Sequence, residues 1–468
     1  MDRPLWWDDL QSLHLANRSI PKVFSSTFGT QFQPLYFLLL KLVLPFKHSL
    51  LALRVPSLAA SLLTMVGATA AAWSISDRKA ALLVSLLFAI NPTQIYYANE
   101  IRYYSLETAL LVWSFAFALW SQFSPKKGNL LSFFSGIAAG LSLLTATFSL
   151  FWAVLIGLFV TGFPSRRPRR DTLLSWLSGA FPFFLFFACD QVSFVRALAH
   201  LPPLHGTFRT ITPRTLLGWG KHTLFGPIAL DASLSRNFVG LAVVTLFALF
   251  LYASRFLTRG IRESRWDRLF LLALVCAPWG FFFLGDLLLG GMYQHRYLLP
   301  SEVFLLIVLG TMLRTNFARG VLLLLVIVSA FLFLPLYFSS ATAYEHFFPY
   351  PVTHSRDFYL PNDLRDLREK IPENETIVFD AIEPFLFWDV FRQGNQPYYL
   401  LRPPYSPHIW SYIKSVPERR WLAAGEPPPG VLHFTIVTSA PARFPKAVIT
   451  NTWKGFSILR LEAHPETE

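Results

Sequence analysis

Long apolar runs separated by short polar connections dominate the chain from residue 49 to residue 340. About ten of these runs approach the ~20 residues that a helix needs to cross the hydrocarbon core of a bilayer. We place them at 49–76, 80–98, 104–123, 130–145, 148–163, 172–190, 236–254, 269–288, 297–313 and 320–339. The nearly continuous run from 130 to 163 is divided at Thr145, which predicts two short helices joined by a tight turn.

The pattern changes after residue 340. The segment NDLRDLREKIPENETIVFDAIEPFLFWDVF predicts an amphipathic helix, a buried strand at Thr376–Asp380 and a second helix. VLHFTIVTSA and FSILRLE predict further strands, and Pro-rich joints lie at 402–407 and 426–429. We therefore expect a small α/β domain over residues 341–468.

Composition agrees with a membrane protein. Apolar residues make up 53% of the chain and charged residues 15%, whereas soluble domains carry about 25% charge. We predict an α-helical polytopic membrane protein with a small C-terminal α/β domain. Its two cysteines, Cys189 and Cys276, both lie in apolar runs, so they form neither a metal-binding spacing nor a disulfide framework.

The distribution of basic residues predicts which connections face the cytoplasm. Alternate connections, at 76–79, 124–129, 164–171, 254–268 and 314–319, hold 15 Lys and Arg residues, and the opposite set holds only six. The positive-inside rule makes the basic set cytoplasmic. Short basic clusters between apolar runs also explain the net charge of +13, so we expect membrane lipids as partners and no nucleic acid.

This alternation predicts that residues 1–48 and 341–468 lie on the outer side of the membrane, flanking a transmembrane core at 49–340. We therefore expect a multi-pass protein of the plasma (inner) membrane, with its active site on the periplasmic or extracellular face. Translocation of residues 1–48 calls for an upstream spanning helix, so we expect eleven spans in all.

Polar residues with catalytic or binding potential gather on the predicted outer side. Each belongs to a short motif: WWDDLQSLHLAN, the Pro-started helix QFQPLYFLLLKL, LRVPSLAA, NPTQIYYANEIRYYSLETALL and GGMYQHRYLLPSE. The candidate residues in these motifs are Asp8, Asp9, Lys41, Arg54, Tyr97, Glu100, Arg102, Tyr104 and Arg296. Tyrosines also form interfacial belts and arginines also snorkel, so packing roles stay open at these positions.

Together, these residue types suit group transfer at a membrane surface. A carboxylate can act as general base towards a hydroxyl acceptor, and arginines can hold and neutralise a phosphate leaving group. A donor carried on a lipid phosphate presents its sugar at this depth. The set therefore favours glycosyl transfer from a polyprenyl phosphate over ion conduction.

The motifs, taken in this order, resemble the C-type superfamily of integral-membrane glycosyltransferases. Within it the chain is most similar to the branch of protein O-mannosyltransferases and the lipid A aminoarabinose transferase. The resemblance covers residues 1 to about 340, and the C-terminal domain resembles the variable C-terminal domains of that branch. It implies an inverting enzyme with a polyprenyl-phosphate or dolichyl-phosphate sugar donor and a lipid, glycan or protein acceptor.

The resemblance also implies residue roles. Asp8 matches the catalytic carboxylate that deprotonates the acceptor, and Asp9 the neighbouring acid. Tyr97, Glu100, Arg102 and Tyr104 fall in the second outer-loop motif, and Arg296 suits the lipid phosphate. Lys41 and Arg54 are further candidates for binding the donor.

Two departures from the branch bear on the metal. Gln33 precedes Pro34 where relatives often carry a charged residue or a histidine, and Gln11 stands where some carry a phosphate-binding arginine. The sequence names no certain cofactor, and a divalent metal stays open.

Two other classes remain. A transporter or flippase of lipid-linked sugars predicts carboxylates at mid-bilayer and broken helices, with Asp190 and Asp286 as the deepest acids. An O-antigen-ligase or polymerase-type enzyme would rely on His205, Arg209 and Arg214 in the long outer loop.

Overall fold

The computed structural model describes most of the helical part of the chain and much of the C-terminal part. The described residues are 5–28, 33–124, 126–162, 169–198, 213–225, 233–262, 266–289, 295–313, 315–338, 358–359, 361–372, 375–380, 382–391, 396–401, 421–422, 428, 433–438, 440–444, 447–453 and 456–462. The chain forms two compact units. The helical unit consists of residues 27–36 and 54–339, and the mixed unit of residues 1–26, 37–53 and 340–468.

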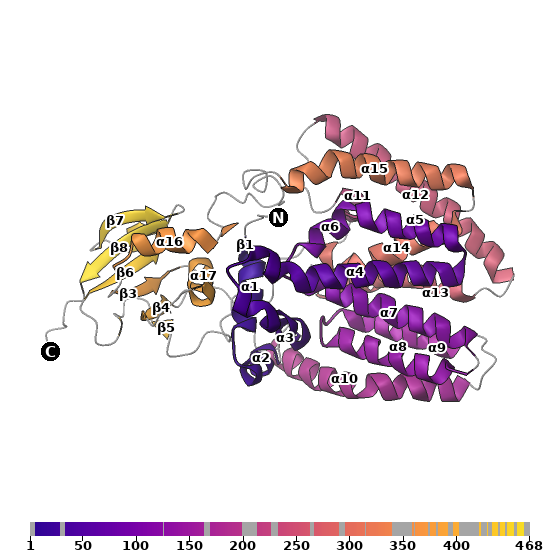
Figure 1. Ribbon diagram of the computed structural model, residues 1–468, viewed down its shortest axis with the longest axis horizontal. Helices are drawn as coiled ribbons and strands as arrows, with labels where there is room; N and C mark the ends of the chain where they lie inside the picture. The colour runs from indigo at the N-terminus through magenta and orange to yellow at the C-terminus, as the bar shows by residue number, and fades with distance from the viewer. Residues whose placement is uncertain are drawn as a thin grey trace. The chain divides into compact units, whose positions relative to one another are not determined.

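The helical unit is built from a succession of apolar helices (Figure 1). They are α4 (Leu50–Ile75, from Arg54 onward), α5 (Arg78–Ile90), α6 (Pro92–Ala98), α7 (Tyr104–Phe123), α8 (Gly128–Leu143), α9 (Ser149–Gly162), α10 (Arg169–Leu198), α11 (Pro213–Phe225), α12 (Ser233–Arg262), α13 (Trp266–Leu289), the 3-10 helix η2 (His295–Leu298), α14 (Leu299–Met312) and α15 (Asn316–Phe338).

Several of these helices are able to span a membrane. Within the described residues, four are long and apolar enough, at Leu50–Ile75, Tyr104–Phe123, Arg170–Ser193 and Phe238–Arg255. The bent pair of α5 and α6 makes a fifth if it is counted as one span. Shorter apolar helices lie at Pro34–Phe46, Gly128–Leu143, Ser149–Val160, Leu269–Leu284 and Asn316–Leu332.

The helix ends confirm one prediction and refine another. The run from 130 to 163 is divided as expected, because α8 ends at Leu143 and α9 begins at Ser149. The run predicted as one span over 80–98 is broken into α5 and α6, which are bent by 62° at the break. Pro92 has no N–H to continue α5, and the Asn91 side chain accepts from the Gln94 N–H at 3.2 Å to begin α6.

Small residues let three helices of this unit approach closely. Figure 1 shows α8 between α7 and α10. On α8, Ser135 exchanges hydrogen bonds of 2.8 Å with Ser114 of α7, each hydroxyl bonding to the other residue's carbonyl. A Cβ at Gly136 would stand 2.0 Å from the Trp176 carbonyl oxygen of α10. Helices in lipid associate through such small-residue contacts.

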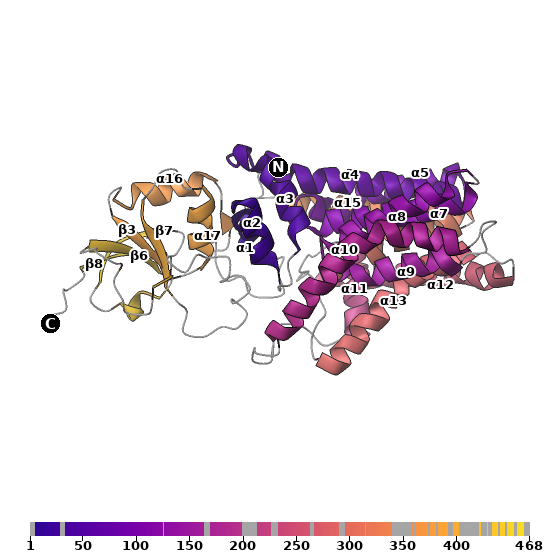
Figure 2. The same cartoon turned by 90° about the horizontal axis from the view of Figure 1, so that it is seen from below.

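The mixed unit contains a six-stranded sheet in the order β5-β4-β3-β6-β8-β7. Its strands are β3 (Thr376–Phe379), β4 (Tyr398–Leu401), β5 (Trp421–Leu422), β6 (His433–Thr438), β7 (Val448–Trp453) and β8 (Phe456–Glu462). The first four in this order are parallel, and β8 and β7 continue antiparallel. Helices α16 (Pro361–Glu369) and α17 (Ile382–Phe391) lie beside the sheet (Figure 2). The predicted α/β character and the predicted strand at 376–380 are thus confirmed.

Residues 1–26 and 37–53 of the N-terminal segment belong to this same unit, whereas residues 27–36 belong to the helical unit. The segment forms β1 (Leu5–Trp6), α1 (Trp7–Ala16), α2 (Ile20–Thr27), α3 (Pro34–Val43) and the 3-10 helix η1 (Leu44–Phe46). β1 pairs antiparallel with β2 (Phe358–Tyr359), and α1 packs against α17. The sequence-based division assigned residues 1–48 and 341–468 to separate domains, and in the structure most of both segments lies in one unit.

Candidate active site

Two of the arginines proposed from the sequence lie around one tyrosine ring in the helical unit. The guanidinium carbon of Arg102 is 5.8 Å from the centre of the Tyr104 ring, and that of Arg296 is 5.7 Å away. Arg102 also lies 5.5 Å from the Tyr103 ring, and Arg296 lies 5.9 Å from the Tyr297 ring. We call these five residues the arginine–tyrosine cluster. Two cations held close together by rings form a site suited to an anion.

Local structure explains why these side chains meet. Arg102 lies in the turn between α6 and α7, and Arg296 lies in η2 just before α14. The turn is held in place because the Ser57 hydroxyl donates to the Arg102 carbonyl at 3.3 Å and the Ser105 hydroxyl to the Tyr97 carbonyl at 3.0 Å. The Tyr36 hydroxyl, 2.8 Å from that of Ser57, ties the start of α3 to the same turn.

Tyr103 adds no negative charge to the cluster near neutral pH. Burial raises the pKa of Tyr103 well above its ordinary value, and the neighbouring Tyr104 and Tyr297 raise it further. The opposing effect of Arg102 and Arg296 is smaller. Tyr103 therefore stays a neutral hydroxyl and does not neutralise the two arginines.

A second polar group in the same unit joins three helices. Nδ1 of His222, on α11, lies 2.7 Å from Oε1 of Glu302 on α14. Nε2 of His222 lies 3.1 Å from the hydroxyl oxygen of Tyr97 on α6. Tyr97 in turn packs edge to face against Tyr104, with ring centres 5.5 Å apart. The Glu302–His222–Tyr97 chain is thus in direct contact with the arginine–tyrosine cluster.

The imidazole of His222, in the Glu302–His222–Tyr97 chain of hydrogen bonds, is neutral over the physiological pH range. Burial lowers the pKa of His222 to about 3, and the charge of Lys221 contributes in the same direction. A neutral imidazole has one donor and one acceptor nitrogen, so the directions of its two hydrogen bonds are linked. The direction of the hydrogen bond between Glu302 and Nδ1 of His222 therefore sets whether Nε2 accepts from the Tyr97 hydroxyl or donates to it.

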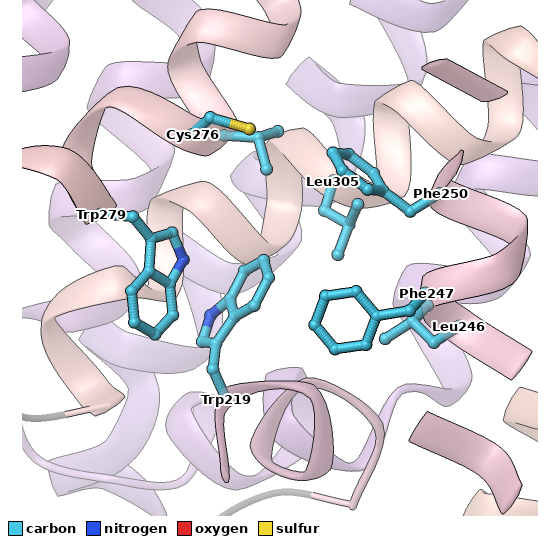
Figure 3. Close-up of a pocket in the computed structure, with 8 residues that line it drawn as sticks. Trp219, Leu246, Phe247, Phe250, Cys276, Trp279 and Leu305 are labelled. Carbon is cyan, nitrogen blue, oxygen red and sulfur yellow. The ribbon is translucent and has the colours of Figure 1, made fainter. Parts of the chain in front are cut away.

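An apolar pocket lies one helical turn from the Glu302–His222–Tyr97 chain of hydrogen bonds. Its volume is about 200 Å³, and it is lined by Trp219, Leu246, Phe247, Phe250, Val275, Cys276, Trp279 and Leu305 (Figure 3). The indole rings of Trp219 and Trp279 meet edge to face, with centres 5.1 Å apart. Trp219 is one turn before His222 on α11, and Leu305 is one turn after Glu302 on α14.

Other candidates of the helical unit lie near the same turn. The Glu100 N–H donates to the Tyr97 carbonyl at 3.3 Å, and the Glu100 side chain is buried. Arg54 is buried on α4, one helical turn before Ser57, which contacts the Arg102 carbonyl. The helical unit thus brings together Tyr97, Glu100, Arg102, Tyr104 and Arg296.

The remaining candidates belong to the mixed unit. Asp8 and Asp9 occupy the first turn of α1, and both side chains are buried. The Ser12 hydroxyl donates to the Asp8 carbonyl at 3.0 Å. The Lys41 ammonium donates to the carbonyls of Ala16 and Arg18, at 3.3 and 2.5 Å, so it caps the C-terminal end of α1.

Gln33, which departs from the branch pattern, has a partner in the structure. Its amide nitrogen donates to Oδ2 of Asp190 at 2.8 Å, and that oxygen also accepts from Gln191 at 2.9 Å. Within the described ranges, no group of three or more His, Cys, Asp or Glu residues could hold a metal ion. Of the three residues of the ligase-type alternative, His205 and Arg209 lie outside the described residues, and Arg214 lies in the first turn of α11.

Sequence reasoning missed His222 and Glu302. Glu302 is a carboxylate inside an apolar run, which is itself a recognised signal of function in membrane helices. His222 gave no local signal, because its partners are separated from it by 80 and 125 positions along the chain.

Solved structures of other proteins share this fold. The ArnT structure from Cupriavidus metallidurans in the apo state aligns with a TM-score of 0.62 at 12% identity, over 98% of this chain and 94% of that one. The same enzyme bound to undecaprenyl phosphate aligns with a TM-score of 0.58 at 12% identity, with the same coverage. An Archaeoglobus fulgidus oligosaccharyltransferase aligns at 0.43, with 13% identity, over 83% of this chain and 60% of that one. No protein-family profile and no curated protein matches the sequence.

The likeness to ArnT confirms the fold implied by the sequence motifs. It extends over nearly the whole chain, including the C-terminal α/β part.

Proposed function

We propose that this protein is an inverting glycosyltransferase. It moves a sugar from a polyprenyl-phosphate donor to a lipid, glycan or protein acceptor on the outer face of the membrane. The observation that carries the proposal is the pair of arginines, Arg102 and Arg296, on the Tyr104 ring. The ArnT fold supports it, because that enzyme was also solved bound to undecaprenyl phosphate.

In this mechanism the arginine–tyrosine cluster holds the phosphate of the donor. As the bond between the anomeric carbon and the phosphate oxygen breaks, the electron pair moves onto the phosphate. Arg102 and Arg296 neutralise the growing charge, and such preorganised cations lower the barrier by several kcal/mol. Tyr103, which stays a neutral hydroxyl, adds no negative charge beside the phosphate.

Asp8 acts as the general base. It takes the proton from the acceptor nucleophile, which attacks the anomeric carbon opposite the leaving phosphate, so the configuration inverts. Asp9 is the neighbouring acid that supports it. The proposal assigns no residue to a metal ion.

The lipid part of the donor needs an apolar surface near the phosphate. The pocket between Trp219, Trp279 and Leu305 is apolar and lies one turn from the Glu302–His222–Tyr97 chain. It offers such a surface to the first isoprene units.

Transfer from radiolabelled polyprenyl-phosphate sugars, with the full-length protein in liposomes and cell-envelope extract as acceptor, tests the proposal. We expect Asp8→Asn to lower kcat by about 10²- to 10⁴-fold, the range typical of a lost general base. Asp366→Asn removes an exposed carboxylate of the same unit and serves as the matched control.

Full activity of both Asp8→Asn and Asp9→Asn would exclude these residues as the base. If the wild type transfers no sugar but moves the lipid-linked donor across the bilayer, the protein is a flippase.

A further inference from the structure

The helix that carries Asp8 and Asp9 is joined at its start to the C-terminal part of the chain. Leu5 pairs with Tyr359 and Trp6 with Phe358, in antiparallel register, immediately before α1 begins at Trp7. The two partners lie more than 350 positions apart in the sequence. The first turn of α1, which contains both carboxylates, is therefore anchored by a strand from the C-terminal segment.

The far end of α1 is held by a buried ionic contact. Nδ1 of His14 lies 2.8 Å from Oδ2 of Asp389 on α17, and the His14 side chain is fully buried. Nε2 of His14 lies 2.9 Å from Nη2 of Arg18. Since a guanidinium can only donate, Nε2 must be the acceptor, and the proton of the neutral ring lies on Nδ1 and points at Asp389.

Asp389 is built to stay ionised in this position. Burial raises the pKa of its carboxyl, but the hydrogen bond from His14, the charge of Arg18 and the hydrogen bond from the Tyr398 hydroxyl outweigh this effect. The net result is a pKa well below the ordinary value. The carboxylate thus joins α1 to both α17 and β4.

Two lysines secure the same end. Lys41 caps α1 through the carbonyls of Ala16 and Arg18, and the Lys47 ammonium donates to the Val390 carbonyl of α17 at 2.5 Å. Residues 37–53 thus hold the C-terminal ends of α1 and α17.

Helix geometry places the His14–Asp389 contact and the Asp8 carboxylate on different faces of α1. At 100° per residue, His14 lies about 120° around the helix from Asp8. The face of α1 with His14 is fixed against α17, so Asp8 lies on a different face of the same helix.

We propose that the C-terminal α/β segment is a positioning element for Asp8, and that the His14–Asp389 contact transmits this positioning through α1. The inference rests on the proposed function, because it assigns the base to Asp8. Neither His14 nor Asp389 touches the substrate. A displacement of about 1 Å in a catalytic group can lower turnover by about 100-fold, so a loosened helix acts on kcat.

The test compares Asp389→Asn and His14→Gln with Asp366→Asn in the full-length protein. We expect at least a tenfold loss of kcat in the first two variants, with the donor KM within about twofold of the wild type. The double variant should be no slower than the worse single variant, because both substitutions remove one contact. His14→Asn, which keeps a donor near the Nδ1 position, should restore part of the rate.

Hydrogen–deuterium exchange of residues 7–16 gives a second readout that needs no activity. Asp389→Asn should speed exchange there and leave residues 108–119 of α7 unchanged. Unchanged kcat and unchanged exchange overturn the proposal, and so does a general loss of protection in both segments.

A milder variant covers the case in which Asp389→Asn does not fold. Tyr398→Phe removes a single hydrogen bond to Asp389, and we expect a smaller kcat loss in the same direction; an unchanged kcat then counts against the proposal. If the wild type is inactive, the proposed function fails, while exchange at residues 7–16 still reports on the contact.

Discussion

Nδ1 of His222 lies 2.7 Å from Oε1 of Glu302, although one residue comes from α11 and the other from an apolar helix. Both side chains are buried. Removal of one partner leaves the other with an unmet hydrogen-bonding group in a buried place, which costs about 1–3 kcal/mol.

We therefore expect His222→Phe to lower the free energy of unfolding by about 2 kcal/mol. The double variant His222→Phe/Glu302→Leu should be more stable than the single one, because it removes both polar groups together. Thermal unfolding in detergent measures both. His48→Phe, at an exposed position, is the control, and a double variant less stable than the single would contradict the pairing.

The lowered pKa of His222 predicts that the stability of the protein depends on pH. The pKa of His222 falls from 6.5 to about 3 on folding, so the unfolded chain binds a proton between these values that the folded protein does not. Stability contributed by neutral His222 is complete above pH 6.5 and is lost as the pH falls towards 3. We expect the unfolding temperature of the wild type to drop between pH 6.5 and 5.

His222→Phe should lack this part of the drop. Asp389, whose pKa is also lowered from its ordinary value of 3.8, affects stability at lower pH, so of these two groups only His222 acts between pH 6.5 and 5. Equal slopes for the wild type and His222→Phe between pH 6.5 and 5 would show that His222 is not the group responsible.

The arginine–tyrosine cluster predicts where the donor phosphate binds. We expect Arg102→Ala and Arg296→Ala each to weaken binding of polyprenyl phosphate by about tenfold or more, since each removes a charge-assisted contact. Arg→Lys at either position should recover only part of the affinity, because lysine lacks the planar fork.

Native mass spectrometry with polyprenyl phosphate, without a sugar, measures this binding directly. Arg78→Ala removes an exposed arginine at the start of α5 and should leave binding unchanged. Wild-type affinity in both cluster variants would move the phosphate site elsewhere.

Local sequence patterns predicted much of the helical architecture. The runs at 49–76 and 104–123 correspond closely to α4 (Leu50–Ile75) and α7 (Tyr104–Phe123), because an apolar run bounded by polar residues defines a helix locally. The division of 130–163 was predicted by its polar threonines. The break in 80–98 was missed, although Asn91 and Pro92 mark it.

Contacts between distant segments were beyond such patterns. Arg102 and Arg296 were each found from position at a helix mouth, yet their common contact with Tyr104 depends on how α7 and η2 pack. The pairing of β1 with β2 involves strands of only two residues, too short for any periodic signal.

Gly136 on α8 predicts how closely α8 and α10 must approach. A Cβ there would stand 2.0 Å from the backbone carbonyl oxygen of Trp176, and backbone cannot move aside as a flexible side chain can. Gly179 on α10 faces the same constraint, with the Phe133 carbonyl oxygen 2.3 Å from its would-be Cβ. We expect Gly136→Ala and Gly179→Ala to force the helices apart and destabilise the protein by about 1–3 kcal/mol, the usual cost of overpacking.

Gly240 on α12 supplies the matched control, because a Cβ there meets nothing within 4 Å. Gly240→Ala should be neutral or stabilise by about 0.5–1 kcal/mol, since alanine loses less backbone entropy in a helix than glycine. Thermal unfolding in detergent therefore distinguishes the two substitutions: Gly136→Ala should lower the stability, and Gly240→Ala should leave it unchanged or raise it. If Gly136→Ala were as stable as Gly240→Ala, α8 and α10 would not pack at the distance that places Ser135 and Trp176 in contact.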